Sequence, residues 1–269
     1  MKRLTIACAL LSLSYSAFAD TVLVTGSNRG IGLQLVTQYA EDGWDVIATS
    51  RSPHDDGDLN ALAEAHSNVT VEQLDVTDMD SIAALAEKYR GQPIDVLINN
   101  AGLLGGRPGQ EWGNLDPDVF QQVMAVNVFG PHKVSEAFAD NVAASDQKKL
   151  IVISSTIGSL SRMQRPTPLP ILATSKAAVN MAMQTVAMQL KDQGVVVAML
   201  MPGLVRTRMS YQATGMTLEE ASQQTDFDFD RPGSISTEES ASRIRTVIAS
   251  LDGSETGLFL NNDGSRLDW

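Results

Sequence analysis

The sequence has a single cysteine and no hydrophobic run long enough to cross a membrane. Cys8 is the only cysteine among 269 residues, so no internal disulfide can form. Three histidines, His54, His66 and His132, are scattered, and no group with metal-ligand spacing is visible. The net charge of −12 argues against nucleic acid and anionic membrane surfaces as partners. The length suits one α/β domain with a full core.

The N-terminal segment differs in composition from the rest of the chain. Two basic residues precede the apolar run 4–13, and an Ala-x-Ala pattern ends at Ala19. This layout is typical of a secretory signal peptide, so we predict a leader over 1–19 and a single mature domain over 20–269. A functional leader would place a cysteine-free protein in the periplasm or outside the cell. The alternative is a buried N-terminal strand or helix in a cytoplasmic protein.

Short apolar runs alternate with amphipathic stretches along the remaining chain. Seven β-branched runs predict buried strands, at Thr21–Thr25, Asp45–Thr49, Val69–Leu74, Ile94–Ile98, Leu150–Ser154, Val195–Leu200 and Gly257–Leu260. Three stretches with apolar periodicity or a glycine stop predict helices, at Leu33–Asp42, Asp78–Arg90 and Lys176–Asp192. This alternation predicts an α/β fold with a doubly wound parallel seven-stranded sheet of Rossmann type and helices on both faces.

Local signals predict further helix starts and one loop. Thr77 is the expected cap of the helix at Asp78, and Asp116-Pro117 combines a cap with proline at the first helical position. Ser236 and Glu239 form a capping box for a helix that reaches about Leu251. The segment 209–233 is the expected substrate lid. Its alternating stretch Asp226–Asp230 suits a mobile acidic loop, with an edge strand as the alternative.

A glycine-rich loop, Thr25–Gly32, follows the first strand and opens the first helix. Its glycines permit a tight turn and close approach of the backbone to a ligand, and the helix N-terminus offers free N–H groups to a pyrophosphate. Taken alone, this loop could also be an ordinary strand–helix turn. Ligands of doubly wound sheets bind at the carboxyl ends of the strands, so the loops after the other strands are the place for further evidence.

Characteristic short stretches follow the later strands. They are Asp75-Val76, Asn99-Asn100-Ala101-Gly102, Ile153–Gly158 and Pro202–Thr207. Asn127 lies in a long predicted helix just before Gly130-Pro131, where proline should distort the helix. With the Gly-x-x-x-Gly-x-Gly spacing of the first loop, this series resembles the short-chain dehydrogenase/reductase family of classical type over residues 21–269.

Finer features resemble the C-factor and Sniffer-like carbonyl reductases most closely. They are the stretch Val46–Pro53, the wide gap between Ser155 and Lys176, and the ending Gly257–Gly264 with terminal Trp269. This resemblance implies that a small carbonyl or alcohol is the substrate. Members of the family usually pair through their fourth and fifth helices, so the resemblance also implies a homodimer or homotetramer.

The resemblance implies a nicotinamide dinucleotide as cofactor. The residues that match the family's cofactor site are Gly26, Asn28, Arg29, Gly30, Ile31, Gly32, Arg51, Asp75, Val76, Asn99, Ala101, Gly102, Lys176, Pro202, Gly203, Val205 and Thr207. An NAD enzyme usually places an acidic residue after the second strand, but this chain has Ser50-Arg51 there. Arg29 and Arg51 favour a 2′-phosphate, and hence NADP(H) over NAD(H), unless both are merely solvated surface residues.

Three of the family's four catalytic positions are filled. Ser155, Lys176 and Asn127 match the serine, lysine and asparagine, but the position of the proton-transferring tyrosine is Leu172. No tyrosine lies between Tyr89 and Tyr211 that a shifted alignment could supply. The segment just before, 165–170, has three prolines and should be a stiff extended loop.

The missing tyrosine leaves three interpretations open. The protein catalyses NADP(H)-dependent interconversion of a carbonyl and an alcohol at an impaired rate, with Lys176 acting through water, or Tyr211, as the acid. Alternatively it binds a dinucleotide without turnover, as a pseudoenzyme with a binding or regulatory role. A purely structural or partner-binding role is the third interpretation.

Overall fold

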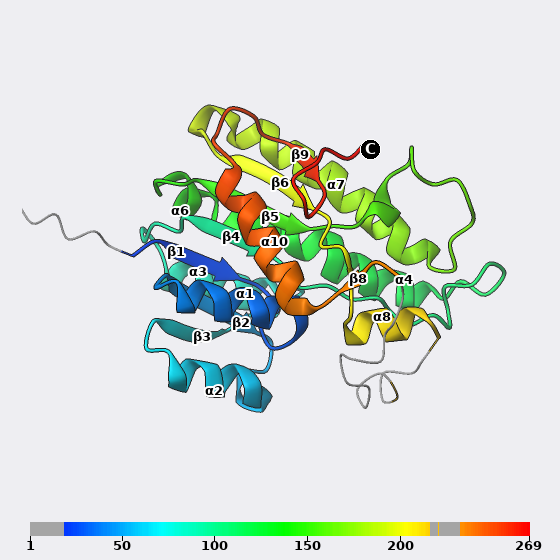
Figure 1. Ribbon diagram of the computed structural model, residues 1–269, viewed down its shortest axis with the longest axis horizontal. Helices are drawn as coiled ribbons and strands as arrows, with labels where there is room; N and C mark the ends of the chain where they lie inside the picture. The colour runs from blue at the N-terminus through cyan, green and yellow to red at the C-terminus, as the bar shows by residue number, and fades with distance from the viewer. Residues whose placement is uncertain (1–18, 216–219, 221–231) are drawn as a thin grey trace, which may run out of the picture.

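A seven-stranded parallel sheet forms the centre of the computed structural model, which describes residues 19–215, 220 and 232–269 (Figure 1). The strand order is β3-β2-β1-β4-β5-β6-β9. The strands span Thr21–Val24 (β1), Asp45–Ser50 (β2), Val69–Gln73 (β3), Val96–Asn99 (β4), Lys149–Ile153 (β5), Val196–Leu200 (β6) and Leu258–Leu260 (β9). The order reverses between β1 and β4, so a ligand crevice is expected beyond their carboxyl ends. This confirms the predicted fold class, and each predicted strand is present within two residues of its expected ends.

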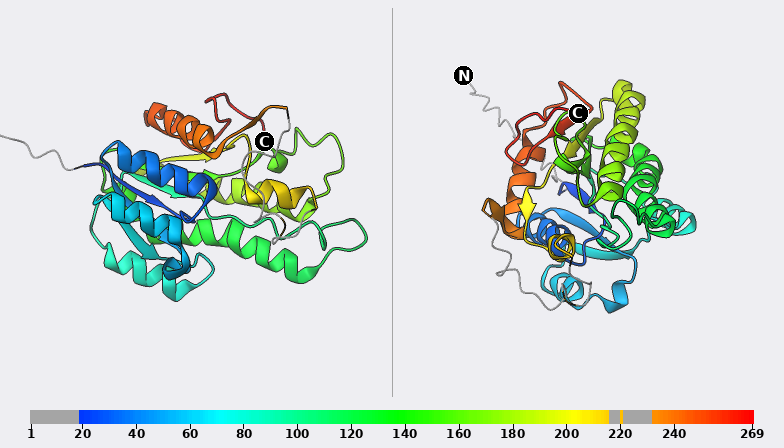
Figure 2. Two further views of the ribbon diagram at one scale, coloured as in Figure 1. Left: turned by 60° about the horizontal axis from the view of Figure 1, so that its bottom comes forward. Right: turned by 90° about the vertical axis from the view of Figure 1, so that its right-hand side faces the viewer.

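Helices cover both faces of the sheet (Figure 2). They span Gly30–Glu41 (α1), Gly57–Ala65 (α2), Met79–Lys88 (α3), Pro117–Met124 (α4), Gly130–Ala137 (α5), Ala139–Ala143 (α6), Pro170–Leu190 (α7), Arg208–Ala213 (α8) and Thr237–Ser250 (α10). Short irregular turns of helix lie at Pro53–Asp55 (η1), Ala125–Phe129 (η2), Thr156–Gly158 (η3) and Lys191–Gln193 (η4), and a two-stranded parallel ribbon joins Leu204–Val205 (β7) to Ser234–Ile235 (β8).

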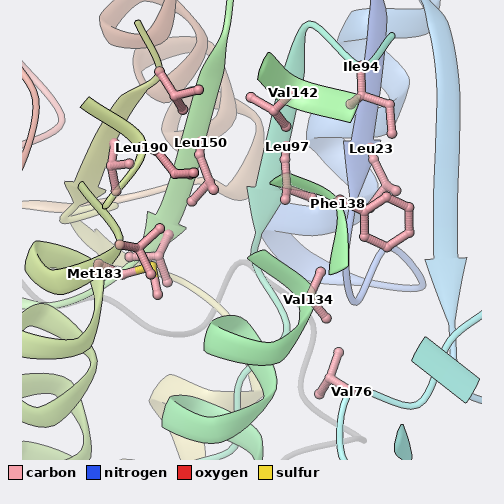
Figure 3. Close-up of a cluster of buried hydrophobic side chains, with 14 of the residues drawn as sticks. Leu23, Val76, Ile94, Leu97, Val134, Phe138, Val142, Leu150, Met183 and Leu190 are labelled. Atoms are coloured by element: carbon pink, nitrogen blue, oxygen red, sulfur yellow. The ribbon is translucent and has the colours of Figure 1, made fainter. Parts of the chain in front are cut away.

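In every strand of the large sheet except β3, alternating residues pack into two separate hydrophobic cores. Leu23 of β1 packs with α3, α5 and α7, whereas its neighbours Val22 and Val24 pack on the other face with α1 and α10. Figure 3 shows the first core, with Phe138, Leu97 and other fully buried side chains between helices and strands. The central strands β4, β5 and β6 are buried on both faces and therefore almost wholly apolar, which is why the sequence predicts their positions well.

The start of α7 differs from the prediction. The helix begins at Pro170 rather than at Lys176, and the expected extended loop therefore ends one residue earlier than its last proline. Pro170 occupies the first turn, where its missing N–H costs nothing and its fixed φ suits the helix. Ile171 and Leu172 in the same turn are buried, and their burial stabilises this early start.

Other local signals are confirmed or corrected at their caps. Asp116 accepts hydrogen bonds from two backbone N–H groups of α4, and Ser236 accepts one from Glu239 N, as predicted. The cap of α3 is Asp78 and not Thr77, because the carboxylate of Asp78 accepts from the N–H groups at its first turn. The expected distortion before Gly130-Pro131 is the π-helical turn η2.

Two predicted segments fall mainly outside the described residues. The leader 1–19 is described only at its last residue, Ala19, and remains a prediction. Of the predicted lid 209–233, the structure describes 209–215, which lies mostly within α8, together with 220 and 232–233, whereas Asp226–Asp230 lies outside the described residues. Among the described helices, none is long and apolar enough to span a bilayer. The described residues also contain no group of acidic, histidine or cysteine side chains that could bind a metal ion.

Candidate active site

The predicted cofactor and catalytic residues gather at one edge of the sheet. The residues that lie in loops follow the carboxyl ends of β1 to β6, at the edge of the sheet toward which the strand arrows in Figure 1 point. Asn127 and Lys176 reach the same region from η2 and α7. Residues more than 150 positions apart in sequence, such as Gly30 and Thr207, thus belong to one site: Thr207 Cγ2 would lie 3.8 Å from a Cβ at Gly30.

The glycine-rich loop has no room for side chains at two of its glycines. A Cβ at Gly26 would lie 2.9 Å from Ala101 Cα, and one at Gly32 would lie 2.3 Å from Gly26 O. Gly26 and Gly30 also have φ values of +67° and +57°, in the region that disfavours other residues. The loop thus packs against the β4 end and opens α1 with a bare backbone, which is the cradle that a pyrophosphate requires.

Asn100 holds the glycine-rich loop in place through its side chain. The sequence places Asn100 in the motif after β4 but indicates no role for it. Its Nδ2 donates to the carbonyl oxygens of Thr25 and Gly26, at 2.9 and 3.0 Å. Thr25 Oγ1 in turn accepts from the N–H groups of Asn100 and Ala101, both at 3.0 Å. These four bonds join the ends of β1 and β4 at the point where the strand order reverses. The doubled asparagine of the motif was the signal for this role.

Charged side chains surround the expected 2′-phosphate end of the cleft. Partial desolvation lowers the pKa of Arg29, and the positive charges of Arg208 and Arg51 lower it further, whereas the carboxylate of Asp56 raises it. Arg208 comes from α8 and Asp56 from the residue before α2, and neither was predicted as a site residue. The guanidinium group of Arg29 is repelled by those of Arg51 and Arg208, and a phosphate would relieve that repulsion.

The remaining cofactor-site residues are fixed by their neighbours. Val76 lies against α5, where a Cβ at Gly130 would meet Val76 O at 2.9 Å. Asn99 is buried and donates through Nδ2 to Ser135 Oγ at 3.1 Å, so its side chain connects the end of β4 to α5. Thr207 caps α8 by accepting from Ser210 N.

The sixth loop is held to the C-terminal part of the chain. Pro202 O accepts bonds from Ser240 Oγ and from Asn262 Nδ2, at 2.7 and 3.2 Å. Gly203 has a φ of +98°, and a Cβ there would lie 2.7 Å from Asn262 Nδ2. The ending of the chain, singled out in the sequence, therefore helps to shape the cofactor side of the cleft.

Ser155, Lys176 and Asn127 lie around the ends of β5 and α7. Lys176 Nζ donates to Ile153 O at 2.8 Å, and burial lowers the pKa of this ammonium group to about 8. Asn127 donates to Leu103 O and Ser175 Oγ and accepts from Leu103 N, at 2.8, 3.0 and 2.7 Å. The π-helical turn thereby aims the Asn127 side chain across to α7 and the β4 loop.

Ser155 is held in place by the close packing of η3 on α7. Its hydroxyl accepts from Ile157 N at 3.3 Å and caps η3. A Cβ at Gly158 would lie 2.6 Å from the backbone carbon of Lys176, so only glycine permits this approach. The approach brings the serine loop and the lysine helix together.

Leu172 lies one helical turn before Lys176 on α7. Its side chain is buried and packs with Leu104 and Leu169 in a small third cluster, against which Ala213 of α8 also packs. Its backbone N–H donates to Gln110 Oε1 at 3.0 Å. The position expected for the tyrosine therefore holds an apolar side chain in an apolar environment, with no hydroxyl to exchange a proton.

Tyr211 lies in the described part of the predicted lid. It lies on α8, two residues before Ala213, and its side chain is buried. The hydroxyl is therefore on the helix that packs against the Leu172 cluster, which keeps Tyr211 a candidate for the missing acid. His54 and His132 are exposed, whereas His66 is half-buried.

Comparisons with known proteins agree on one family. The family model described as short chain dehydrogenase matches residues 20–217. A short chain dehydrogenase of Penicillium aethiopicum, gsfK, is 34% identical over 257 residues, which cover 93% of this chain and 99% of that protein.

Solved structures with the same fold include carbonyl reductases. The NADPH-bound carbonyl reductase from chicken fatty liver has a TM-score of 0.80 at 30% identity and covers 93% of this chain and 99% of its own. A carbonyl reductase from Pseudomonas aeruginosa PAO1 in complex with NADP has a TM-score of 0.75 at 25% identity, over 93% of this chain and 100% of its own. With the fold, the cleft and the family model in agreement, the chain belongs to the short chain dehydrogenase family of oxidoreductases.

Proposed function

We propose that the protein is an NADP(H)-dependent oxidoreductase that interconverts a carbonyl and an alcohol on a small organic substrate, at a rate limited by the leucine at position 172. The observation that supports this most is the bare glycine cradle beside the cluster of Arg29, Arg51 and Arg208. The cradle suits a pyrophosphate and the arginines suit a 2′-phosphate. The two solved relatives described above hold NADPH and NADP.

Ser155, Lys176 and Asn127 each have a separate proposed role in the reaction. When bound, the nicotinamide supplies or accepts a hydride. Ser155 is placed to bind the substrate oxygen through its hydroxyl. Lys176, with a pKa of about 8, is protonated at neutral pH and is the acid that gives a proton to that oxygen, directly or through water. Asn127 holds the β4 loop against α7 and so fixes the wall of the site.

The leucine sets the expected rate. A positioned acid is worth about 10²–10⁴-fold in such a reaction, and an apolar group beside a developing oxyanion cannot stabilise it. An ammonium group one turn away replaces part of this effect, because it is four residues from Leu172 on the same helix face. Turnover is thus expected to be slow but measurable.

One observation favours a second candidate, a dinucleotide-binding protein without turnover. Leu172 contributes to an apolar cluster with Leu104 and Leu169, and Ala213 seals it. Such packing stabilises the substrate side of the cleft, but its apolar side chains cannot donate or relay a proton. In this case the nucleotide acts as a ligand that stabilises the fold.

Two measurements separate these candidates. NADPH is titrated into the protein while thermal unfolding is followed; binding raises the midpoint, and no shift at saturating cofactor would contradict both candidates. NADPH oxidation is then followed with a panel of aldehydes and ketones. Turnover that disappears in Lys176→Met, while NADPH still binds, supports the reductase; binding with no turnover for any substrate supports the second candidate.

We propose further that the leader is removed at Ala19. Ala19 is exposed, whereas Asp20 is held by the fold: its carboxylate accepts from Gln147 Nε2 at 2.8 Å, and its carbonyl accepts from Asp45 N at 3.0 Å. Cleavage before Asp20 would therefore leave β1 intact. Mass spectrometry of the mature N-terminus tests this: a start at Asp20 supports export, and an intact Met1 supports a cytoplasmic protein.

The assembly is proposed on the family resemblance and on one exposed face. Met181 and Met188 lie two turns apart on α7 and are 70% and 78% exposed. Phe129 of η2, a segment packed against α7, is 51% exposed. We propose that this face pairs two copies in a homodimer or homotetramer. Sedimentation of the protein and of Met188→Glu tests it: dissociation of the variant supports pairing here, and a monomeric parent contradicts it.

A further inference from the structure

A carboxylate stands beside the arginines at the nucleotide end of the cleft, although the sequence has none directly after β2. The chain leaves β2 at Ser50, turns through η1 and returns, so that Asp56 lies back at the end of the strand. Asp56 Oδ2 accepts a short hydrogen bond from Ser50 Oγ, and Asp56 Oδ1 accepts from Asn28 Nδ2 at 2.9 Å. One side chain therefore connects the glycine-rich loop to the second strand.

Two further observations locate the charge of this carboxylate. Ser50 is buried and Asp56 is half-buried, so the carboxylate is held from within the protein by the Ser50 hydroxyl and still keeps part of its surface exposed. Arg29, the residue after Asn28, experiences the charge of Asp56 together with those of Arg51 and Arg208. The group thus contributes one negative charge within a cluster that otherwise has three positive charges.

We propose that Asp56 is a specificity-determining residue that weakens the preference for NADP(H) over NAD(H). The inference rests on the proposed function, because it assumes that a 2′-phosphate binds beside Arg29 and Arg51. A phosphate dianion there would be attracted by the arginines and repelled by the carboxylate of Asp56. A ribose 2′-hydroxyl has no charge to repel and can donate to a carboxylate. The arginines and Asp56 therefore act in opposite directions on the choice between the two cofactors.

Substitution by asparagine isolates the charge. In Asp56→Asn the new amide oxygen still accepts from Ser50, and the Asn28 amide can reverse so that its oxygen accepts from the new amide nitrogen. The connection between loop and strand is kept while the charge is removed. Ser50→Ala does the opposite, because it deletes one bond and keeps the carboxylate. Asp58→Asn is the matched control, since Asp58 is exposed in the first turn of α2 and its loss changes the net charge equally.

The test uses the two adenine halves of the cofactors as ligands. Calorimetric titrations of adenosine 2′,5′-bisphosphate and adenosine 5′-monophosphate give a ratio of dissociation constants for each variant. In Asp56→Asn we expect tighter binding of the bisphosphate, so that the ratio in its favour rises about 5-fold to 30-fold, and this gain should shrink at high salt. In Ser50→Ala both ligands should weaken together, and in Asp58→Asn the ratio should change less than about twofold.

The outcomes are distinct. An unchanged ratio in Asp56→Asn, or an equal loss of both ligands, would overturn the inference and leave a structural role for Asp56, with the proposed function intact if the parent binds the bisphosphate. A parent that binds neither ligand overturns the proposed function and the inference with it. Circular dichroism melts of each variant confirm that the ratio is measured on folded protein.

Discussion

Different interactions stabilise the two sides of the cleft: hydrogen bonds on the cofactor side and apolar packing on the substrate side. On the cofactor side, polar bonds hold a backbone with no spare volume: Asn100 and Thr25 join the ends of β1 and β4, and no Cβ fits at Gly32. On the substrate side, the Leu172 cluster is held by apolar packing with one buried polar anchor, Gln110. The first kind of structure tolerates little change, whereas the second tolerates the exchange of one apolar side chain for another. This difference is consistent with our proposal that the catalytic position at Leu172 has changed while the cofactor cleft is kept.

On the cofactor side, Gly32→Ala should be the most damaging substitution. Its Cβ would lie 2.3 Å from Gly26 O and 2.5 Å from Asn100 Nδ2, so the loop must move away from β4. We expect a loss of NADPH binding of more than about 100-fold and a loss of stability of about 1–3 kcal/mol. Gly57→Ala is the control, because a Cβ there meets nothing within 4 Å. Thermal unfolding with and without NADPH measures both effects, and normal NADPH binding by Gly32→Ala would refute a rigid cradle.

The substrate side has its own weak point in Gln110. This fully buried side chain donates to Leu104 O at 2.7 Å and to Gly106 O at 2.5 Å, and accepts from Leu172 N. Gln110→Ala leaves these buried groups unpaired and should lower stability by about 1–3 kcal/mol. NADPH affinity should change by less than about threefold, because the cradle is held independently. Chemical denaturation and an NADPH titration check this, with exposed Gln122→Ala as control; an equal loss of cofactor binding would show that the two sides are coupled.

A third prediction concerns the proton. Burial lowers the pKa of Lys176 to about 8, so its ammonium form is lost as pH rises through that value. Carbonyl reduction should fall about tenfold from about pH 7 to about pH 9, and alcohol oxidation should rise over the same interval. NADPH binding, measured across the same range, separates chemistry from cofactor affinity. A flat reduction profile would exclude Lys176 as the acid; if Tyr211→Phe then abolished turnover, the acid would be Tyr211.

The smallest effect is expected at the N-terminus. A protein that begins at Asp20 keeps the bond that Asp20 Oδ2 accepts from Gln147 Nε2, at 2.8 Å, and the bond that Thr21 N donates to Asp95 Oδ2, at 2.9 Å. Its unfolding midpoint and NADPH affinity should equal those of the full chain within error. A clear loss of stability would mean that residues before Asp20 contribute to the fold and would contradict the predicted domain boundary.

The sequence predicted what depends on local patterns. The strands, the glycine-rich loop and the cap at Asp116 are each determined within a few residues, and the structure shows them close to the expected places. The start of α7 was missed because a proline-rich stretch indicates extended chain, although Pro170 suits a first helical turn. Asp56, Arg208 and Gln110 were missed because their roles depend on turns that bring distant segments together. No local signal marks such residues.

We propose that the cofactor side of the cleft is intact and that the lack of a hydroxyl group at position 172 limits the rate of the reaction. Steady-state NADPH oxidation by the parent, Leu172→Tyr and the matched Leu172→Phe tests it most directly, since the last two differ by a single oxygen. We expect kcat to be about 10²–10⁴-fold higher in Leu172→Tyr than in Leu172→Phe, with NADPH affinity equal in both. Equal kcat values in folded, NADPH-binding variants would contradict it.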